Sequence, residues 1–172
     1  MRRSVAIAII LFSIFLSSNS ISSTGVWEWQ NPKPQGNSLR SVDYLDASTA
    51  MAVGAAGMVL MTTDGGSTWT YKTRIASDMG LDDVGLIDAN TASCVGNVGV
   101  IIRTTDGGYT WNQQTSGITT DLHGGAFPDV NYGYAVGKYG VILTTSNGGT
   151  AWTPQTSGTT EHLLGVSFTD VN

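Results

Sequence analysis

An eight-residue motif recurs three times along this chain at nearly constant spacing. The copies are Thr62–Trp69 (TTDGGSTW), Thr104–Trp111 (TTDGGYTW) and Thr145–Trp152 (TSNGGTAW). Their final tryptophans lie 42 and then 41 residues apart. A period of this length is typical of proteins that stack copies of one supersecondary unit, as β-propellers do. The spacing therefore predicts one unit repeated side by side.

The repeat register extends beyond the motif. Leucine recurs at the start of each copy and glycine at two central positions: Leu39, Leu81, Leu122 and Leu163; Gly54, Gly96 and Gly137; Gly57, Gly99 and Gly140. The single extra residue of the longer interval lies between Trp69 and Leu81. This is a connection, where changes of length cost little free energy.

Each copy divides into four short extended segments. In the third copy these are residues 122–129, 133–137, 141–145 and 152–156, which we call strands A to D. Glycine and asparagine dominate the connections, and 22 of the 172 residues are glycine, which is typical of strands joined by tight turns. Such short connections join antiparallel neighbours, and four strands form one propeller blade.

The predicted fold is therefore all-β: a β-propeller of four-stranded antiparallel blades with a 41–42-residue repeat, present as an open fragment of about three blades plus one incomplete blade. The predicted units are blade repeats 1 (39–80), 2 (81–121) and 3 (122–162) and the start of a truncated repeat 4 (163–172). Residues 24–38 are predicted to hold strand D of a ring-closing blade, because Trp27 precedes Leu39 by the same twelve residues that separate Trp69 from Leu81. Three blades do not close a ring, so we expect further blades downstream.

Residues 1–23 have the pattern of a signal peptide. Arg2 and Arg3 precede a twelve-residue apolar run, which small polar residues follow, with a cleavage position after Ser20. A helix of that length spans about 18 Å, less than the roughly 30 Å core of a bilayer. We expect an exported protein, periplasmic, cell-surface or extracellular, with no membrane span in the mature chain.

Charge and cysteine content narrow the possible partners. Removal of the two N-terminal arginines leaves six Lys and Arg against 13 Asp and Glu, so nucleic acid is not an expected partner.

Cys94 is the single cysteine and has alanine at its equivalent positions, Ala52 and Ala135. It is therefore interpreted as a small buried apolar residue.

The repeated motif has the chemistry of a structural turn. Its Asp or Asn accepts hydrogen bonds from turn amides, its glycines permit positive φ, and its tryptophan places a large ring between sheets. The residues concerned are Thr62, Asp64, Gly66 and Trp69; Thr104, Asp106, Gly108 and Trp111; and Thr145, Asn147, Gly149 and Trp152.

These residues resemble the Asp-box, or bacterial neuraminidase repeat. The third copy departs from its pattern at Asn147 and Ala151, so we expect a less tightly held turn there. Together with WNQQTSG (Trp111–Gly117) and GYAVG (Gly133–Gly137), the boxes resemble the photosystem II stability/assembly factor family, from about Trp27 onward. The resemblance implies a propeller in which the boxes lie at the end of the blades opposite the functional face. Their acids are therefore expected to be structural.

Candidate binding residues lie where propellers usually meet ligands, at the D-to-A connections and B-to-C turns. Equivalent positions there hold different residues in the three copies. Either this face binds a particular partner, or the exposed turn residues vary without a functional reason. The candidates are Arg40, Asp82, Asp121, His123, Lys138 and Tyr139. No cofactor is predicted, and no metal, because His123 and His162 lack supporting ligands.

The expected function is that of a non-catalytic protein-binding or assembly scaffold, with a glycan as the alternative ligand. A glycoside hydrolase is the competing interpretation, because Asp-box propellers include sialidases. Only three arginines remain after export, at different strand positions, whereas a sialidase needs several that converge on one carboxylate. Hydrolysis by two carboxylates needs two acids about 5–10 Å apart. The candidates are the acids predicted near the ligand-binding face, namely Asp82, Asp83 and Asp121.

Overall fold

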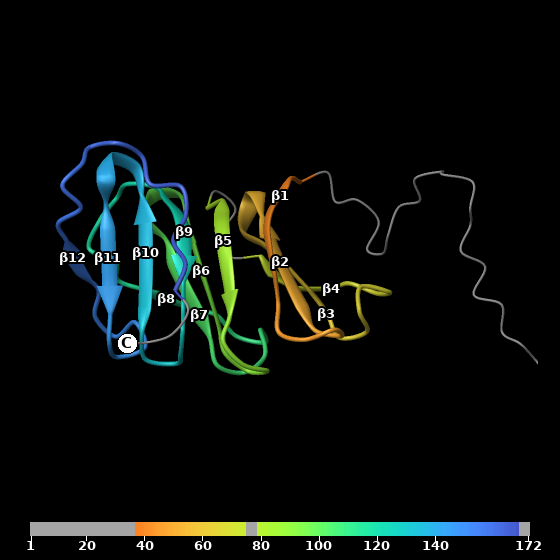
Figure 1. The fold of residues 1–172 in the computed structure, drawn as a ribbon. Helices are drawn as coiled ribbons and strands as arrows, with labels where there is room; N and C mark the ends of the chain where they lie inside the picture. Colours follow the sequence, from red (N-terminus) through yellow and green to blue (C-terminus); the bar gives the residue numbers. More distant parts are fainter. Residues whose placement is uncertain (1–36, 75–78, 169–172) are drawn as a thin grey trace, which may run out of the picture.

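The computed structural model describes residues 37–74 and 79–168. Twelve strands in these ranges form three four-stranded sheets that follow one another along the chain (Figure 1). The first sheet contains β1 (Leu39–Tyr44), β2 (Ala50–Gly54), β3 (Met58–Thr62) and β4 (Thr70–Arg74). The second contains β5 (Leu81–Leu86), β6 (Ala92–Gly96), β7 (Ile101–Thr104) and β8 (Asn112–Gln114). The third contains β9 (Leu122–Ala126), β10 (Gly133–Gly137), β11 (Ile142–Thr145) and β12 (Thr153–Gln155).

Each sheet is an antiparallel meander whose strand order follows the chain. The first residue of strand A pairs with the glycine that ends strand B in all three sheets: Leu39 with Gly54, Leu81 with Gly96 and Leu122 with Gly137. A three-residue 3₁₀ turn joins strands B and C in each sheet, namely η1 (Ala55–Gly57), η2 (Asn97–Gly99) and η3 (Lys138–Gly140). The predicted all-β fold of four-stranded antiparallel blades is confirmed.

The hydrophobic core lies between the blades. One cluster joins blades 1 and 2 and includes Met51, Val59 and Cys94, while another joins blades 2 and 3 and includes Ile101 and Leu143. Cys94 is fully buried, and this burial raises the pKa of its thiol, so the residue is an unreactive part of the core. A third cluster lies within blade 1. Because the first two clusters lie between neighbouring blades, the blades stabilise one another.

The eight-residue boxes connect strands C and D. In the second box, Asp106 accepts hydrogen bonds from the Thr104 hydroxyl at 2.8 Å, the Thr110 N–H at 2.9 Å and the Thr110 hydroxyl at 2.6 Å. In the third box, Asn147 accepts the hydrogen bonds equivalent to those from the Thr104 hydroxyl and the Thr110 N–H. The bond from the Thr110 hydroxyl has no equivalent, because Ala151 has no hydroxyl. The side chain of Asn147 therefore accepts one hydrogen bond fewer, but the Thr150 hydroxyl donates a 3.0 Å bond to the Asn147 carbonyl, which Tyr109 does not do at the equivalent position. The less tightly held turn expected from the sequence is therefore not seen in the number of hydrogen bonds.

Several predicted segments differ from the structure or lie outside it. The repeat register predicts the beginning of strand A of a fourth blade at residues 163–168, but they form no strand, because the described part of the chain offers no strand B beside them. They are held instead by a 3.0 Å hydrogen bond from the Leu163 N–H to the Gly137 carbonyl and by stacking of Phe168 on Tyr134. The predicted signal peptide and the strand at 24–38 lie outside the described residues.

Strands A and D of the third blade are shorter than predicted, ending at Ala126 and spanning Thr153–Gln155. None of the helical segments in the described ranges is long and apolar enough to cross a membrane.

Candidate functional site

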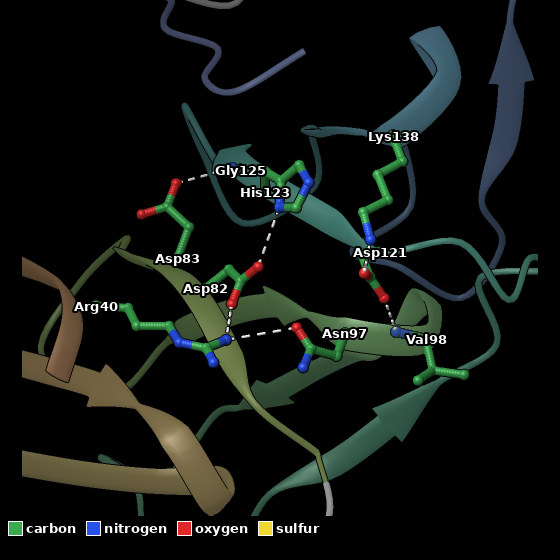
Figure 2. A network of polar contacts seen from close by, with 9 residues as sticks. All are labelled: Arg40, Asp82, Asp83, Asn97, Val98, Asp121, His123, Gly125 and Lys138. Atoms are coloured by element: carbon green, nitrogen blue, oxygen red, sulfur yellow. Dashed lines mark hydrogen bonds and ion pairs between the residues drawn. The ribbon is translucent and has the colours of Figure 1, made fainter. Parts of the chain in front are cut away.

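Three of the predicted binding residues meet across three blades. Arg40 of β1 forms an ion pair with Asp82 of β5, and His123 Nδ1 of β9 lies 3.1 Å from the other Asp82 carboxylate oxygen (Figure 2). Arg40 Nη1 also lies 3.4 Å from Asn97 Oδ1 in the turn η2. The Asp82 carboxylate therefore bridges a cation of blade 1 and an imidazole of blade 3.

A β-bulge at the start of each strand A positions these side chains. The ladder register skips Arg40 in β1, Asp82 in β5 and His123 in β9, each directly after the leucine that begins its strand. A bulge leaves one residue unpaired and redirects its side chain, often beside a functional site. Each blade therefore presents one polar side chain from the same position. The recurring leucine marks this position in the sequence, but the bulge itself depends on pairing with strand B.

Asp121 and Lys138 form a second pair at the same end of the blades. Lys138 Nζ donates a 2.6 Å hydrogen bond to Asp121 Oδ2, and the Val98 N–H donates a 2.8 Å bond to Asp121 Oδ1 (Figure 2). The hydrogen bond from Lys138, followed by that from Val98, lowers the pKa of Asp121 and keeps it ionised. Asp121 thus fastens the B-to-C turn of blade 2 to that of blade 3.

The B-to-C turns have an unexpected backbone conformation. Ala56, Val98 and Tyr139 have φ near +59°, in the left-handed region, at equivalent positions of the three turns. The sequence predicts positive φ only for glycines, and a left-handed valine is unusual because its branched Cβ is crowded there. This conformation presents Tyr139 outward, with 65% of its surface exposed.

Aromatic contacts extend the polar group to Tyr139. The Tyr139 and His162 ring centroids are 5.4 Å apart, and those of His162 and His123 are 6.4 Å apart. We call the set Arg40, Asp82, Asp121, His123, Lys138 and Tyr139 the rim network. All six predicted residues therefore lie at the B-to-C end of the blades, in two groups. Four of them are linked by contacts that also include Asn97 and His162, and Asp121 and Lys138 form a separate pair. Within residues 37–74 and 79–168, no three His, Cys, Asp or Glu side chains form a cluster suited to a metal ion.

Asp83 serves a different role from its neighbour Asp82. It accepts a 2.6 Å hydrogen bond from the Ser41 hydroxyl of blade 1. It also accepts a 2.8 Å bond from the Gly125 N–H of blade 3, which Figure 2 shows. It lines a hollow of about 410 Å³ between the first strands of the blades, together with Phe127 and Phe168. The sequence groups Asp83 with the candidate catalytic acids, whereas its hydrogen bonds join three blades.

The rim network and the boxes lie at opposite ends of the same strands. Strand β7 begins just after the turn η2 and ends at Thr104, the first residue of its box, and the other strands C run likewise. Arg40 and Lys138 each expose 39% of their side chains, while their carboxylate partners are more buried. The end of the blades that carries the rim network therefore offers hydrogen-bond donors held in place by acids beneath them.

Comparison with known proteins identifies related families. A family model described as photosynthesis system II assembly factor YCF48 matches residues 20–115. No curated protein sequence matches the chain. A structure of YCF48 bound to D1 peptide shares 23% sequence identity with this chain and superposes on it with a TM-score of 0.64. The aligned region covers 72% of this chain and 43% of that YCF48 chain.

Two further solved structures have the same fold. YCF48 from Cyanidioschyzon merolae is 27% identical, covers 76% of this chain and 43% of its own, and has a TM-score of 0.60. The GH74 enzyme of Niastella koreensis is 17% identical, covers 76% of this chain and 24% of its own, and has a TM-score of 0.59. The match with this chain thus extends over 43% of the length of either YCF48 structure, and the likeness to the hydrolase concerns the fold alone.

Proposed function

Because this chain belongs to the family of the photosynthesis system II assembly factor YCF48, we propose that it acts as an exported, non-catalytic propeller that binds a polypeptide partner through the rim network. A YCF48 structure holds a D1 peptide, which supports a polypeptide as the class of ligand. The observation that carries the proposal is the convergence of side chains from three blades on one end of the molecule. Export is inferred from the pattern of residues 1–23.

The chemistry of the rim network suits a polypeptide. Arg40 and Lys138 offer donors to backbone carbonyls or acidic side chains, and the exposed ring of Tyr139 offers an apolar anchor. A polar rim around an aromatic anchor is common at protein interfaces. Because the carboxylates of Asp82 and Asp121 hold the two cations, the surface is ordered before a partner arrives, which reduces the entropy lost on binding.

The same contacts argue against glycoside hydrolysis. A general acid in this chemistry needs a raised pKa, whereas Lys138 lowers that of Asp121. Asp82 is engaged by Arg40 and His123. Arg103, which a sialidase-like site would need beside Arg40, instead donates to the Val130 carbonyl at 2.7 Å, near the box end of blade 3. These arrangements support a binding role without catalysis.

The test combines quantitative capture with hydrolysis assays. The purified protein is used to capture partners from the exported fraction, and bound proteins are quantified by mass spectrometry. We expect Lys138→Glu, which reverses a rim charge, to lower capture of a stoichiometric partner about tenfold or more. Asp106→Asn, at the opposite end of the strands, is the matched control and is expected to leave capture unchanged.

Two results would contradict the proposal. One is equal loss of capture in both variants. The other is turnover of sialosides or β-glucans that disappears on Asp82→Ala or Asp121→Ala.

A further inference from the structure

The two histidines of the chain lie side by side at the rim network. His123 belongs to β9 and His162 follows blade 3, yet their ring centroids are 6.4 Å apart. The His162 ring also contacts Tyr139, with the centroids 5.4 Å apart. A histidine side chain ordinarily gains its charge between about pH 8 and pH 5, so two adjacent imidazoles can change the charge of this surface within that range.

The two imidazoles differ in their acidic partners. His123 Nδ1 lies 3.1 Å from Asp82 Oδ2, and a carboxylate that is paired with Arg40 only accepts hydrogen bonds, so we infer that Nδ1 carries the proton (Figure 2). A second proton then binds at Nε2 and leaves the contact with Asp82 in place. Within residues 37–74 and 79–168, no carboxylate forms an ion pair or a hydrogen bond with His162.

The other charged side chains around His162 do not compensate a charge on its ring. They are two ion pairs and one exposed acid, namely Lys138 with Asp121, Arg40 with Asp82, and Glu161. Each pair contains one cation and one carboxylate, so neither leaves an acid free for the ring. A protonated His162 therefore faces a protonated His123 without an acid of its own.

His162 also precedes the backbone hydrogen bond that holds the following segment to blade 3. The Leu163 N–H donates to the Gly137 carbonyl at 3.0 Å, and Gly137 ends β10 directly before η3, which carries Tyr139. The ring contact of His162 and the hydrogen bond of Leu163 thus hold the same segment to the same turn.

We propose that this contact is a pH-sensitive switch. When both histidines are protonated, the repulsion between their rings separates His162 from His123 and Tyr139 and loosens the hydrogen bond of Leu163. Asp82 keeps His123 in place, so His162 is the ring that moves. The switch goes beyond the proposed function and does not depend on it.

Amide hydrogen exchange of the full chain, followed by NMR in the presence of EDTA, tests this proposal. We expect the protection factor of Leu163 to be about threefold lower at about pH 5 than at about pH 7.5, the effect of two unit charges about 6 Å apart in water. His162→Gln and His123→Gln each remove one of the two charges and should abolish this difference. The Gly96 N–H, which donates to the Val100 carbonyl at 3.0 Å, is the control for folding and should keep its protection factor.

Three outcomes would overturn the proposal. One is an equal protection factor of Leu163 at both pH values in the parent chain. Another is a pH difference that persists in His162→Gln while Gly96 stays protected. The third is a pH difference that appears only when EDTA is omitted, which would instead assign the two rings to a metal ion.

Discussion

At the residue scale, the box acids act as acceptors for several donors at once. The hydroxyl and N–H of Thr110, with the hydroxyl of Thr104, lower the pKa of Asp106 from 3.8 to about 2. The folded-state pKa is thus below the unfolded value, so the carboxylate stabilises the fold above about pH 4 and loses this effect as the pH falls toward 2.

We therefore expect the denaturant midpoint to fall between about pH 4 and about pH 2, and Asp106→Asn to lessen that fall. Asn147 makes the equivalent turn without a titrating group, so the variant should keep the fold. The measurement is a urea unfolding series at several pH values. An identical pH dependence in the parent and the variant would show that Asp106 does not contribute.

The unsatisfied indole of Trp111 provides a second residue-scale prediction. Lys72→Gln should supply the missing acceptor, as Gln114 does for Trp152, at the cost of the contact between Lys72 and Tyr109. A buried unpaired donor costs about 1–3 kcal/mol and an exposed cation–π contact contributes about 0.5–1 kcal/mol, so the melting temperature should rise by about 2–4 °C. The control is Lys72→Met, which removes the charge without adding an acceptor. This variant should not raise the melting temperature.

At the element scale, the turns between strands depend on glycines in the left-handed region. Gly149 and Gly158 have φ of +82° and +75°, but only Gly149 lies against another blade, beneath Gln114. Gly158→Ala should cost about 1–2 kcal/mol from backbone strain alone. Gly149→Ala should cost about 1–2 kcal/mol more, because the displaced carboxamide loses its hydrogen bonds to Trp152 and Gly148. Equal free energies of unfolding for the two variants would mean that the amide contact adds nothing.

At the scale of the whole molecule, the blades are joined by apolar clusters and by polar side chains that reach across them. Asp83 belongs to blade 2 and binds donors of blades 1 and 3. Asp83→Ala should lower the free energy of unfolding by about 2–4 kcal/mol, because the Ser41 hydroxyl and the N–H groups of Val84 and Gly125 lose a charged acceptor. Ser41→Ala removes one of the donors and should cost less. Calorimetry of both variants checks the order, and a smaller effect for Asp83→Ala would contradict this role.

The period of the chain, the four strands of each blade and the box turns could be predicted from the sequence. These features depend on residues close together in the chain, and three repeats display the same pattern, so each copy supports the others. The six residues of the rim network are candidates chosen in the same way, because the repeat register shows which positions vary at equivalent places, and their role in binding stays a prediction.

Only the tertiary structure decided how those residues are connected. The bulges that turn Arg40, Asp82 and His123 toward one another, the left-handed Val98 and the hydrogen bonds of Gln114 all depend on how one blade is placed against the next. Residues that meet there are about one repeat apart in the chain, and their spacing does not record the angle or distance between sheets. The sequence by itself therefore determined the blade, whereas the packing of blades decided which side chains contact one another in the rim network.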